Sequence, residues 1–533
     1  MSNEAARREF IRSLAVGAAV AIPSCGVALA ATSEVKEPNG KLFFNIADFG
    51  AIGDGKTLCT PAIQKAIDAC AQAGGGKILV PAGRYVTNAL FLKSNVHVEV
   101  LAGGTLAFTN DIASVGSVQG RWEGIDRTVY ASLFNGQSLE NVSITGRGTL
   151  EGQGKPWWDA YRKVRQMRRE AGMGDEREPE NPPGSPLNWG RPRMINLYDC
   201  KNVLISGLHI QNSPSWNIHP VRCEHVNIDG VTITAPADSP NTDGIDPDSC
   251  KDVRISNCYI SVGDDCIIIK SGYRYREDGV PCENITVTNC VFGAGHCGVG
   301  IGSETSGGVK NVVVSNCVCD GTDRGLRIKT ARTRGNVVEN FRASNVVMRN
   351  VTEAITVTMF YTGGDRHKAE PADKFTPTFR SLHFSDISVN GAKQAILIEG
   401  LAEMPIRGLS VNNFNGENAE VGLTCVNAIG VSLSNLVIDS QKGPVFDVDT
   451  VTNLELLRVT TTKPRQADPI VRLSNVSDGA VQLCSAPQGA KAFLELRGTA
   501  NRNIAMIGNR FPVSEQAVSF ADGATRAAIT KES

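Results

Sequence analysis

The chain has 533 residues, of which 41% are hydrophobic and only 6% are aromatic. A chain of this length can bury a large core, which must here be built mainly from small and branched side chains. Its formal net charge of -1 at pH 7 excludes a broadly basic surface of the kind that binds nucleic acid, so any site for a polyanion must be local.

Residues 1–30 have the features of an export signal. Arginines in "RREFIR" precede an uncharged, alanine-rich run over 13–33, which predicts a mature chain that begins near Ala31. The order resembles a twin-arginine signal, which implies a bacterial protein exported to the periplasm or the medium. Pro23 disfavours both an uncleaved membrane anchor and a lipid anchor at Cys25.

Two segments stand apart from the rest of the chain. Residues 60–76, "TPAIQKAIDACAQAGGG", have apolar residues at helical spacing before a glycine run. They predict a short helix that caps the open end of a strand stack, with an ordinary peripheral helix as the alternative. Residues 155–193, rich in Trp, Arg, Glu and Pro, predict an inserted charged helix and a proline-rich loop.

The middle of the chain repeats one pattern. Successive copies read "VLISGLHI", "VNIDGVTI", "VRISNCYI", "ITVTNCVF" and "VVVSNCVC", and they align Gly207, Gly230, Asn257, Asn289 and Asn316 at intervals of 23, 27, 32 and 27 residues. Each copy alternates apolar and polar residues, bends at Gly or Asn, and resumes with an apolar pair. Repeats of this period predict a solenoid in which each strand coil buries its apolar face against its neighbours.

The predicted fold is therefore all-β, with one solenoid domain over 41–510 and a polar tail over 511–533. The repeats weaken from about residue 405. A β-sandwich is the alternative, but its turns would recur every 8 to 12 residues or so without a longer period.

The sequence holds 15 cysteines. Cys258, Cys290 and Cys317 occupy the same place in three repeats, which favours one small buried residue per coil over disulfide bridges. Cysteine and histidine spacing does not match a zinc site.

Polar residues recur at the same long interval. Asp243 lies 21 residues before Asp264, His296 lies 32 later, Arg327 a further 31 and Tyr361 a further 34. Because adjacent coils sit about 4.8 Å apart, five such positions would line a groove of roughly 19 Å. That length suits several units of a linear chain.

The carboxylates suggest a reaction. Two carboxyl groups that flank a water molecule can hydrolyse a glycosidic bond with inversion, one as the acid and the other as the base. Asp264 and Asp265 both reach one site only if the backbone is irregular there, which Gly263 permits. Crowded negative charge should raise at least one pKa, and His296 could tune that proton.

Arg327 and Lys329 in "RIK" are two residues apart, so they share one face of a strand. A guanidinium beside an ammonium suits the carboxylate of a uronic acid. Tyr361 follows Phe360 and could stack on a sugar.

Each motif alone has a simpler explanation, such as a turn or a solvated surface. Calcium is the main competitor, with the possible ligands Asp243, Asp246, Asp248 and Asp252, but the spacing lacks the Gly and the terminal Glu of a calcium loop. The joint occurrence at coil spacing favours an active site.

The ordered motifs resemble glycoside hydrolase family 28, the polygalacturonase family. The likeness extends over residues 43–400 and includes "FGAIGDGKT", "NSPSW", "NTDG", "GDD", "GH", "GIGSETSGG" and "RIK". It implies a right-handed parallel β-helix. One departure is Cys297, where the family's Gly-His-Gly has its second glycine.

By this resemblance Asp264 is the general acid, Asp243 and Asp265 activate water, and His296 supports protonation of the acid. The residues that hold substrate would be Asn241, Arg327, Lys329 and Tyr361.

The resemblance implies hydrolysis of α-1,4 bonds between galacturonate residues in pectin, with inversion and without a metal or other cofactor. We expect a monomer that binds neither nucleic acid nor, once the signal is removed, a membrane. Residues 155–193 would close one end of the groove and favour release from a chain end. Alternatives are a calcium-dependent polyuronate lyase, a hydrolase of rhamnogalacturonan or substituted galacturonan, and a non-catalytic glycan-binding β-helix.

Overall fold

The computed structural model describes residues 43–173, 181–274, 279–463, 466–511 and 516–532. All of them belong to one compact unit, Lys41–Ser533. The expected export signal over 1–30 lies outside the described residues. Within the described residues, no helix is both long and apolar enough to span a bilayer.

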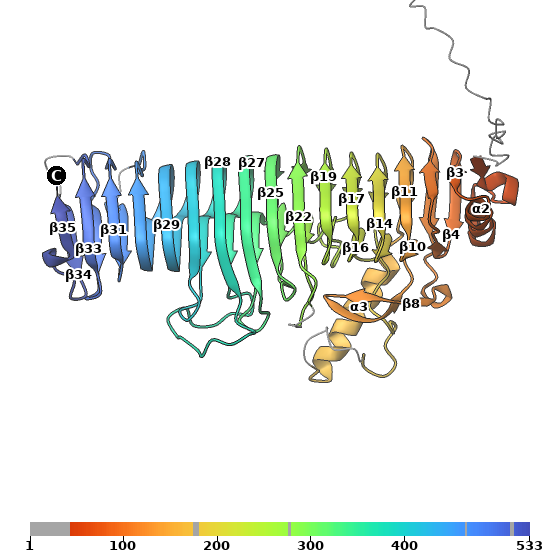
Figure 1. The fold of residues 1–533 in the computed structure, drawn as a ribbon, viewed down its shortest axis with the longest axis horizontal. Coiled ribbons are helices and arrows are strands. Elements are labelled where there is room, and N and C mark those ends of the chain that lie inside the picture. Colours follow the sequence, from red (N-terminus) through yellow and green to blue (C-terminus); the bar gives the residue numbers. More distant parts are fainter. Residues whose placement is uncertain (1–42, 174–180, 275–278, 464–465, 512–515, 533) are drawn as a thin grey trace, which may run out of the picture. The chain divides into compact units, whose positions relative to one another are not determined.

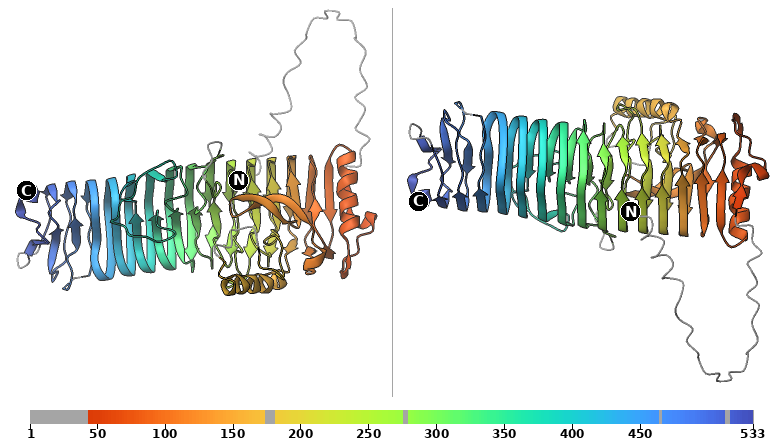
Figure 2. Two further views of the ribbon diagram at one scale, coloured as in Figure 1. Left: turned by 90° about the horizontal axis from the view of Figure 1, so that it is seen from below. Right: turned by 90° about the horizontal axis from the view of Figure 1, so that it is seen from above.

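Parallel strands stack in three ladders, and consecutive coils of the chain lie side by side along the stack (Figures 1 and 2). Ladder A begins with β1 (Phe43–Asn45), β3 (Gly76–Val80), β6 (Val96–Val100), β11 (Glu140–Gly146), β14 (Lys201–Ser206), β17 (Glu224–Asp229), β19 (Lys251–Ser256) and β22 (Cys282–Thr288). Ladder B holds β2 (Asp54–Leu58), β4 (Gly83–Thr87), β7 (Gly104–Phe108), β12 (Thr149–Glu151), β15 (His209–Gln211), β18 (Thr232–Thr234), β20 (Tyr259–Ser261) and β23 (Val291–Phe292).

Ladder C carries the functional residues and runs through β5 (Leu90–Phe91), β10 (Phe134–Gln137), β13 (Ile195–Tyr198), β16 (Ile218–Val221), β21 (Ile267–Ile269), β24 (Val299–Ile301) and β26 (Arg324–Lys329). Residues 245–248 bridge β16 to β21 in this ladder.

Later strands bend around more than one face of the coil: β25 (Val309–Asp320), β27 (Val337–Thr358), β28 (Thr378–Glu399) and β29 (Ile406–Leu457). The last coils contain β30 (Val471–Ser474), β31 (Ser477–Gln482), β32 (Ala492–Arg497), β33 (Arg502–Ile507), β34 (Gln516–Ala521) and β35 (Ile529–Glu532).

The core follows from the register of these ladders. In ladder A, Val203 pairs with Val226, Val226 with Val253, and Val253 with Ile285. All four side chains are at most 2% exposed. Alternate residues of a strand face opposite sides, so each coil contributes branched side chains to the interior and polar ones to the surface. The predicted all-β solenoid is confirmed.

The bends fall where the repeats predict them. Gly207, Gly230, Asn257, Asn289 and Asn316 all have φ between 55° and 72°, in the left-handed region that Gly and Asn tolerate best. Asparagine side chains also bond from coil to coil. Asn345 donates to Asn316 at 2.8 Å, and Asn289 donates to Asn257 at 3.4 Å.

The predicted N-terminal helix is α2 (Thr60–Gln72), with Pro61 in its first turn. It lies at the N-terminal end of the stack, beside β3 (Figure 1). Its buried face of Ile63, Ala66, Ile67 and Cys70 joins the core of the coils. The helix therefore caps the stack, as expected. Three short 3-10 turns complete the helical elements of the described residues: η1 (Ile46–Phe49), η2 (Ile112–Ser114) and η3 (Arg526–Ala528).

The segment 155–193 contains α3 (Lys155–Glu170), which projects from the same side of the stack as the loop between β27 and β28 (Figure 1). An antiparallel hairpin, β8 (Ser117–Trp122) and β9 (Ile125–Tyr130), lies beside α3 on that side. Both insertions leave the regular coils intact.

The cysteines behave as packed thiols. Every cysteine within the described residues is free and buried. Cys258, Cys290 and Cys317 are each at most 2% exposed. The expectation of free thiols is met for this part of the chain.

The C-terminal boundary needs a correction. Residues 511–533 were expected to form a polar tail, but β34 pairs with β32 and β35 pairs with β33, so the coils continue. From about residue 405 the repeats are harder to recognise, because some bends are made by Thr450, Arg458 and Leu483, all at φ between 52° and 54°. Without Gly or Asn at the bend, the sequence no longer marks where one strand ends and the next begins.

The ladder of bend asparagines should contribute measurably to stability. Asn311, at φ 58°, donates to Asn284 at 2.9 Å and accepts from Asn340 at 2.8 Å. Asn311→Ala should lower the free energy of unfolding by about 1–2 kcal/mol, since it strains the bend and removes exposed hydrogen bonds. The matched variant Asn311→Gly should lose less, because Gly tolerates this φ. Urea unfolding compares them, and an alanine variant as stable as the glycine one would contradict the prediction.

Candidate active site

Three aspartates lie where the chain passes from ladder B to ladder C. Asp243 precedes the 245–248 segment, and Asp264 and Asp265 precede β21. The backbone N–H of Gly244 donates to the carbonyl of Asp265 at 3.0 Å, which sets the two coils in register. Because Asp264 and Asp265 lie in a turn, they do not alternate as strand residues would. Both can therefore face one site.

Tight packing of these coils requires Gly263. A Cβ there would lie 2.1 Å from the carbonyl oxygen of Ser239. The N–H of Gly263 donates to Thr242 Oγ1 at 3.0 Å. The glycine in "VGDD" and the threonine in "NTDG" thus hold the two acidic turns together.

The three carboxylates converge, and one oxygen from each lies within 4.8 Å of the others. Asp243 and Asp265 are each 3% exposed, whereas the Asp264 side chain is 19% exposed. Three like charges this close raise one another's pKa unless cations compensate. The surrounding cations therefore decide which carboxylate is ionised.

Asp264 faces His296 and Asn241. His296 Nδ1 lies 3.0 Å from Asp264 Oδ1, and Asn241 Nδ2 donates to Asp264 Oδ2 at 3.4 Å. The hydrogen bond to Asp264 raises the pKa of His296 above its usual value, although partial burial opposes it. Arg191, from the inserted segment, donates to Asn241 Oδ1 at 2.5 Å and fixes the amide. His296 and Asp264 together form a site that can hold a proton.

Asp265 is paired with Lys329. The ammonium of Lys329 donates to Asp265 Oδ2 at 2.8 Å, and its side chain is only 7% exposed. Burial would raise the pKa of Asp265, but Lys329 and Arg327 outweigh burial and lower it well below the usual range. Asp265 is accordingly held in its ionised form.

Arg327 and Lys329 share the outer face of β26, while Ile328 is 1% exposed and points inward. Both cations lie over the ring of Tyr361, at 5.8 and 5.5 Å from its centroid. Tyr361 is 39% exposed, so its ring is open to a ligand. Lys329 is already bound to Asp265, which leaves Arg327 and Tyr361 as the freer surface.

Asp243 has the opposite environment to Asp265. Burial, and then the charges of Asp264 and Asp246, raise its pKa well above the usual value. Lys270 opposes this shift from 3.4 Å, the distance from its Nζ to Asp243 Oδ2. Asp243 therefore ionises less readily than Asp265.

These side chains surround one pocket. Of the residues expected from the sequence, Asn241, Asp243, Asp264, Asp265, Lys329 and Tyr361 line it. His296 and Arg327 flank it through Asp264 and Tyr361. The structure thus brings the whole expected set to one place.

The pocket also has lining residues that the sequence analysis missed: Glu123, Trp216, Lys270, Gly302, Ser303 and Glu304. Lys270 directly follows the apolar run of "CIIIKSG". A single cation after a buried strand was the one feature of the sequence that could have marked it as a pocket residue. Glu123 comes from the β8–β9 hairpin, which has no repeat to place it.

The calcium alternative requires four aspartates at one site, but two of them, Asp248 and Asp252, are paired with other groups. Asp248 accepts from Arg121 at 2.8 Å, and Asp252 accepts from Asn284 on ladder A at 2.8 Å. Within the described residues, the one acidic group close enough to hold an ion is Asp243, Asp264 and Asp265. Lys270 and Lys329 already lie against two of these carboxylates, and their charge competes with a bound cation.

Comparison with known proteins identifies the family. The model of glycosyl hydrolases family 28 matches residues 185–434. A probable polygalacturonase of Vitis vinifera is 32% identical over 404 residues, which cover 73% of this chain and 78% of the relative. An endo-polygalacturonase of Pectobacterium carotovorum subsp. carotovorum is 31% identical over 368 residues, 66% of this chain and 82% of the relative.

The chain belongs to glycosyl hydrolase family 28.

Solved structures agree with this assignment. An exopolygalacturonase from Thermotoga maritima matches with a TM-score of 0.63 and 32% identity, over 74% of this chain and 91% of that one. A family 28 exopolygalacturonase from Yersinia enterocolitica shares the fold, with a TM-score of 0.60 and 22% identity over 90% of this chain and 77% of that one. The right-handed parallel β-helix is thus the fold of this glycoside hydrolase. Residues 43–103 separately match a model named for rhamnogalacturonase A/epimerase, pectate lyase-like proteins.

The pairing of His296 with Asp264 predicts a titration that can be measured without substrate. His296 should titrate above its usual pKa of about 6.5, and Asp264→Asn should lower that pKa, since it removes the carboxylate charge. The raised pKa means that the contact stabilises the fold fully below about pH 6.5 and less as the pH rises through the folded value. NMR of histidine-labelled protein tests this, with His296→Gln to assign the signal. An unshifted signal in the Asp264→Asn variant would refute the pairing.

Proposed function

We propose that this glycoside hydrolase cleaves α-1,4 bonds between galacturonate residues of pectin by acid and base catalysis. The observation that carries the proposal is the convergence of three carboxylates in one pocket, each with a different counter-group. Its relatives named polygalacturonase support the substrate class. Rhamnogalacturonan or substituted galacturonan is the alternative substrate.

In the proposed reaction, Asp264 gives its proton to the bridging oxygen as the bond from that oxygen to C1 breaks. Water attacks C1 and releases a proton to the carboxylate pair Asp243 and Asp265. His296 holds a proton beside Asp264. After turnover, proton exchange with solvent returns a proton to Asp264 and removes one from the Asp243 and Asp265 pair. The products are a new reducing end and a new non-reducing end.

Substrate binding is assigned to Asn241, Arg327, Lys329 and Tyr361. Arg327 is partly exposed and its guanidinium lies 5.8 Å from the centroid of the Tyr361 ring, where it could pair with a sugar carboxylate. Lys329 lines the pocket while bound to Asp265. It would meet substrate only from beside that carboxylate.

Inversion is part of the proposal, and the geometry constrains how it occurs. Inverting pairs usually lie about 6.5–9.5 Å apart, whereas retaining pairs lie about 5–5.5 Å apart. Here one oxygen of each aspartate lies within 4.8 Å of the others, and the carboxyl groups as a whole can lie farther apart than these selected oxygens. Inversion then requires that Asp243 and Asp265 bind the attacking water between them, on the side away from Asp264.

Attack from a chain end is also proposed. The inserted segment packs against the coils that carry the pocket: Trp158 Nε1 donates to the carbonyl of Ser213 at 3.0 Å, and Arg162 donates to the carbonyl of Asp238 at 2.9 Å. Arg191 of the same segment touches Asn241. A wall on one side of the pocket would admit the end of a galacturonan and hinder its interior.

Export, a bacterial origin and a monomeric state stay predictions from the sequence. The twin-arginine pattern in "RREFIR" supports export. Periplasm and medium are both compatible with it.

Asp264→Asn should reduce hydrolysis of polygalacturonate by at least about 100-fold, since it removes the general acid. The matched control Asp386→Asn changes an exposed aspartate on β28 and should keep parental activity. Reducing ends are counted in EDTA, which should not inhibit. Unsaturated products that absorb ultraviolet light, together with loss of activity in EDTA, would instead indicate a calcium-dependent lyase. Binding without product release would indicate a non-catalytic glycan-binding protein.

The first products should be short, uniform in length and β-anomeric. Inversion at an α-linkage gives the β-anomer, and chain-end attack releases one size of product while viscosity falls slowly. Time-resolved proton NMR and chromatography on polygalacturonate measure both. Initial α-anomers would contradict inversion, and an initial spread of lengths with a rapid fall in viscosity would contradict chain-end attack.

A further inference from the structure

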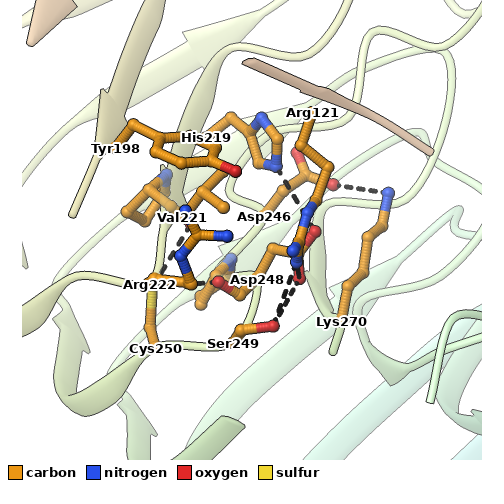
Figure 3. A network of polar contacts seen from close by, with 12 residues as sticks. Arg121, Tyr198, His219, Val221, Arg222, Asp246, Asp248, Ser249, Cys250 and Lys270 are labelled. Carbon is orange, nitrogen blue, oxygen red and sulfur yellow. Dashed lines mark hydrogen bonds and ion pairs between the residues drawn. The ribbon is translucent and has the colours of Figure 1, made fainter. Parts of the chain in front are cut away.

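Lys270 is a buried cation beneath the pocket. It follows β21 and is 4% exposed. Its ammonium lies 2.9 Å from Asp246 Oδ1 and 3.4 Å from Asp243 Oδ2, and Figure 3 shows it directed at Asp246. On another side it lies 3.8 Å from the centroid of the Trp216 ring. A cation so enclosed has little freedom to move.

We propose that Lys270 is a positioning residue that lowers the proton affinity of Asp243 and orients its carboxylate toward the attacking water. This inference rests on the proposed hydrolysis and extends it, because Lys270 belongs to none of the motifs through which the family was recognised. Lys270 would act through Asp243 and make no bond to the reacting atoms.

Asp243 needs such a partner more than Asp265 does. Both are buried beside Asp264, and burial and like charge each favour the protonated form. Asp265 has Lys329 at 2.8 Å. Among the described residues, Lys270 is the one cation within 4.0 Å of Asp243. The ammonium of Lys270 therefore limits how tightly Asp243 holds a proton, and its removal should make that carboxylate harder still to ionise.

The charge of Lys270 is fixed by its surroundings. Burial would lower the pKa of Lys270, but Asp246 and Asp243 outweigh burial and raise it well above its usual value. Burial raises the pKa of Asp246 to about 6, and Lys270 limits that shift. Lys270 therefore stays charged while the carboxylates around it titrate.

Other charged groups also face this region, and a pH profile must be interpreted with all of them in view. Arg193 lies in the loop before β13, His219 on β16 and Glu304 in the loop after β24. The acidic turns contribute Asp264 and Asp265. Burial lowers the pKa of His219 to about 3, so His219 stays neutral near pH 5. Asp243 and Asp246 are then the groups beside Lys270 with raised pKa values.

Two other roles for Lys270 make different predictions. A direct contact with a sugar carboxylate would make the Lys270 variant raise KM. A purely structural role would lower activity by the same factor at every pH. The proposed role moves the acid limb of the profile, since that limb reports the ionisation of a base in the free enzyme.

The test compares pH profiles of kcat/KM on polygalacturonate for the parent, Lys270→Met and Asp246→Asn. Lys270→Met removes a cation next to Asp243 and should move the acid limb up by about one pH unit, with KM changed less than about threefold. Asp246→Asn removes an anion and should move the limb down. Lys310→Met is the matched control, because Lys310 pairs with Glu283 on the surface of ladder A. The acid limb of its kcat/KM profile should coincide with that of the parent.

The acid limb should move up in Lys270→Met and down in Asp246→Asn. Opposite shifts indicate an effect of charge on Asp243, because a loss of packing would not depend on the sign of the charge removed. A Lys270→Met limb that coincides with the parent, or a raised KM with an unmoved limb, would overturn the proposal. If Lys270→Met does not fold, Lys270→Arg replaces it and should keep the parental limb, and the downward shift in Asp246→Asn decides. A limb in Asp246→Asn that stays or rises would then overturn the proposal. A parent that does not cleave polygalacturonate would instead reject the proposed function.

Discussion

Three carboxylates share one pocket because each has its own compensating group. Removing a carboxylate from water costs several kcal/mol unless it is paired or protonated. Asp265 is paired with Lys329, Asp243 with Lys270, and Asp264 with His296. The environments of two of these identical side chains separate their proton affinities, since the pKa of Asp265 is lowered and the pKa of Asp243 is raised. Carboxylates separated in this way can divide the acid and base roles within one site.

The coil geometry makes these pairings possible. Asp265 and Lys329 are separated by 64 residues in sequence, yet they meet because ladder C places successive coils about 4.8 Å apart. Side chains on its outer face point the same way, whereas their neighbours fill the core. The backbone therefore fixes where each charge lies, and little reorganisation is needed when the pocket fills.

The sequence predicted those features that repeat. Gly207 to Asn316 marked the coils, and the intervals from Asp243 to Tyr361 placed the acidic and basic residues on one wall. What does not repeat was missed. Lys270 follows a hydrophobic run and belongs to none of the recurring motifs, so only coordinates show that it reaches Asp243. The coils after about residue 405 were harder to recognise because some of their bends lack the usual Gly or Asn, as at Arg458 and Leu483.

The charged groups beneath the pocket are also paired with one another. Arg121 bonds to Asp248 at 2.8 Å, and His219 lies 3.8 Å from the other oxygen of Asp248 (Figure 3). Buried ion pairs of this kind contribute little net stability, but breaking one leaves an uncompensated charge. Since each pairing joins different coils or an insertion to a coil, the site needs neighbours on both sides, which a position within the stack provides and a terminal coil does not.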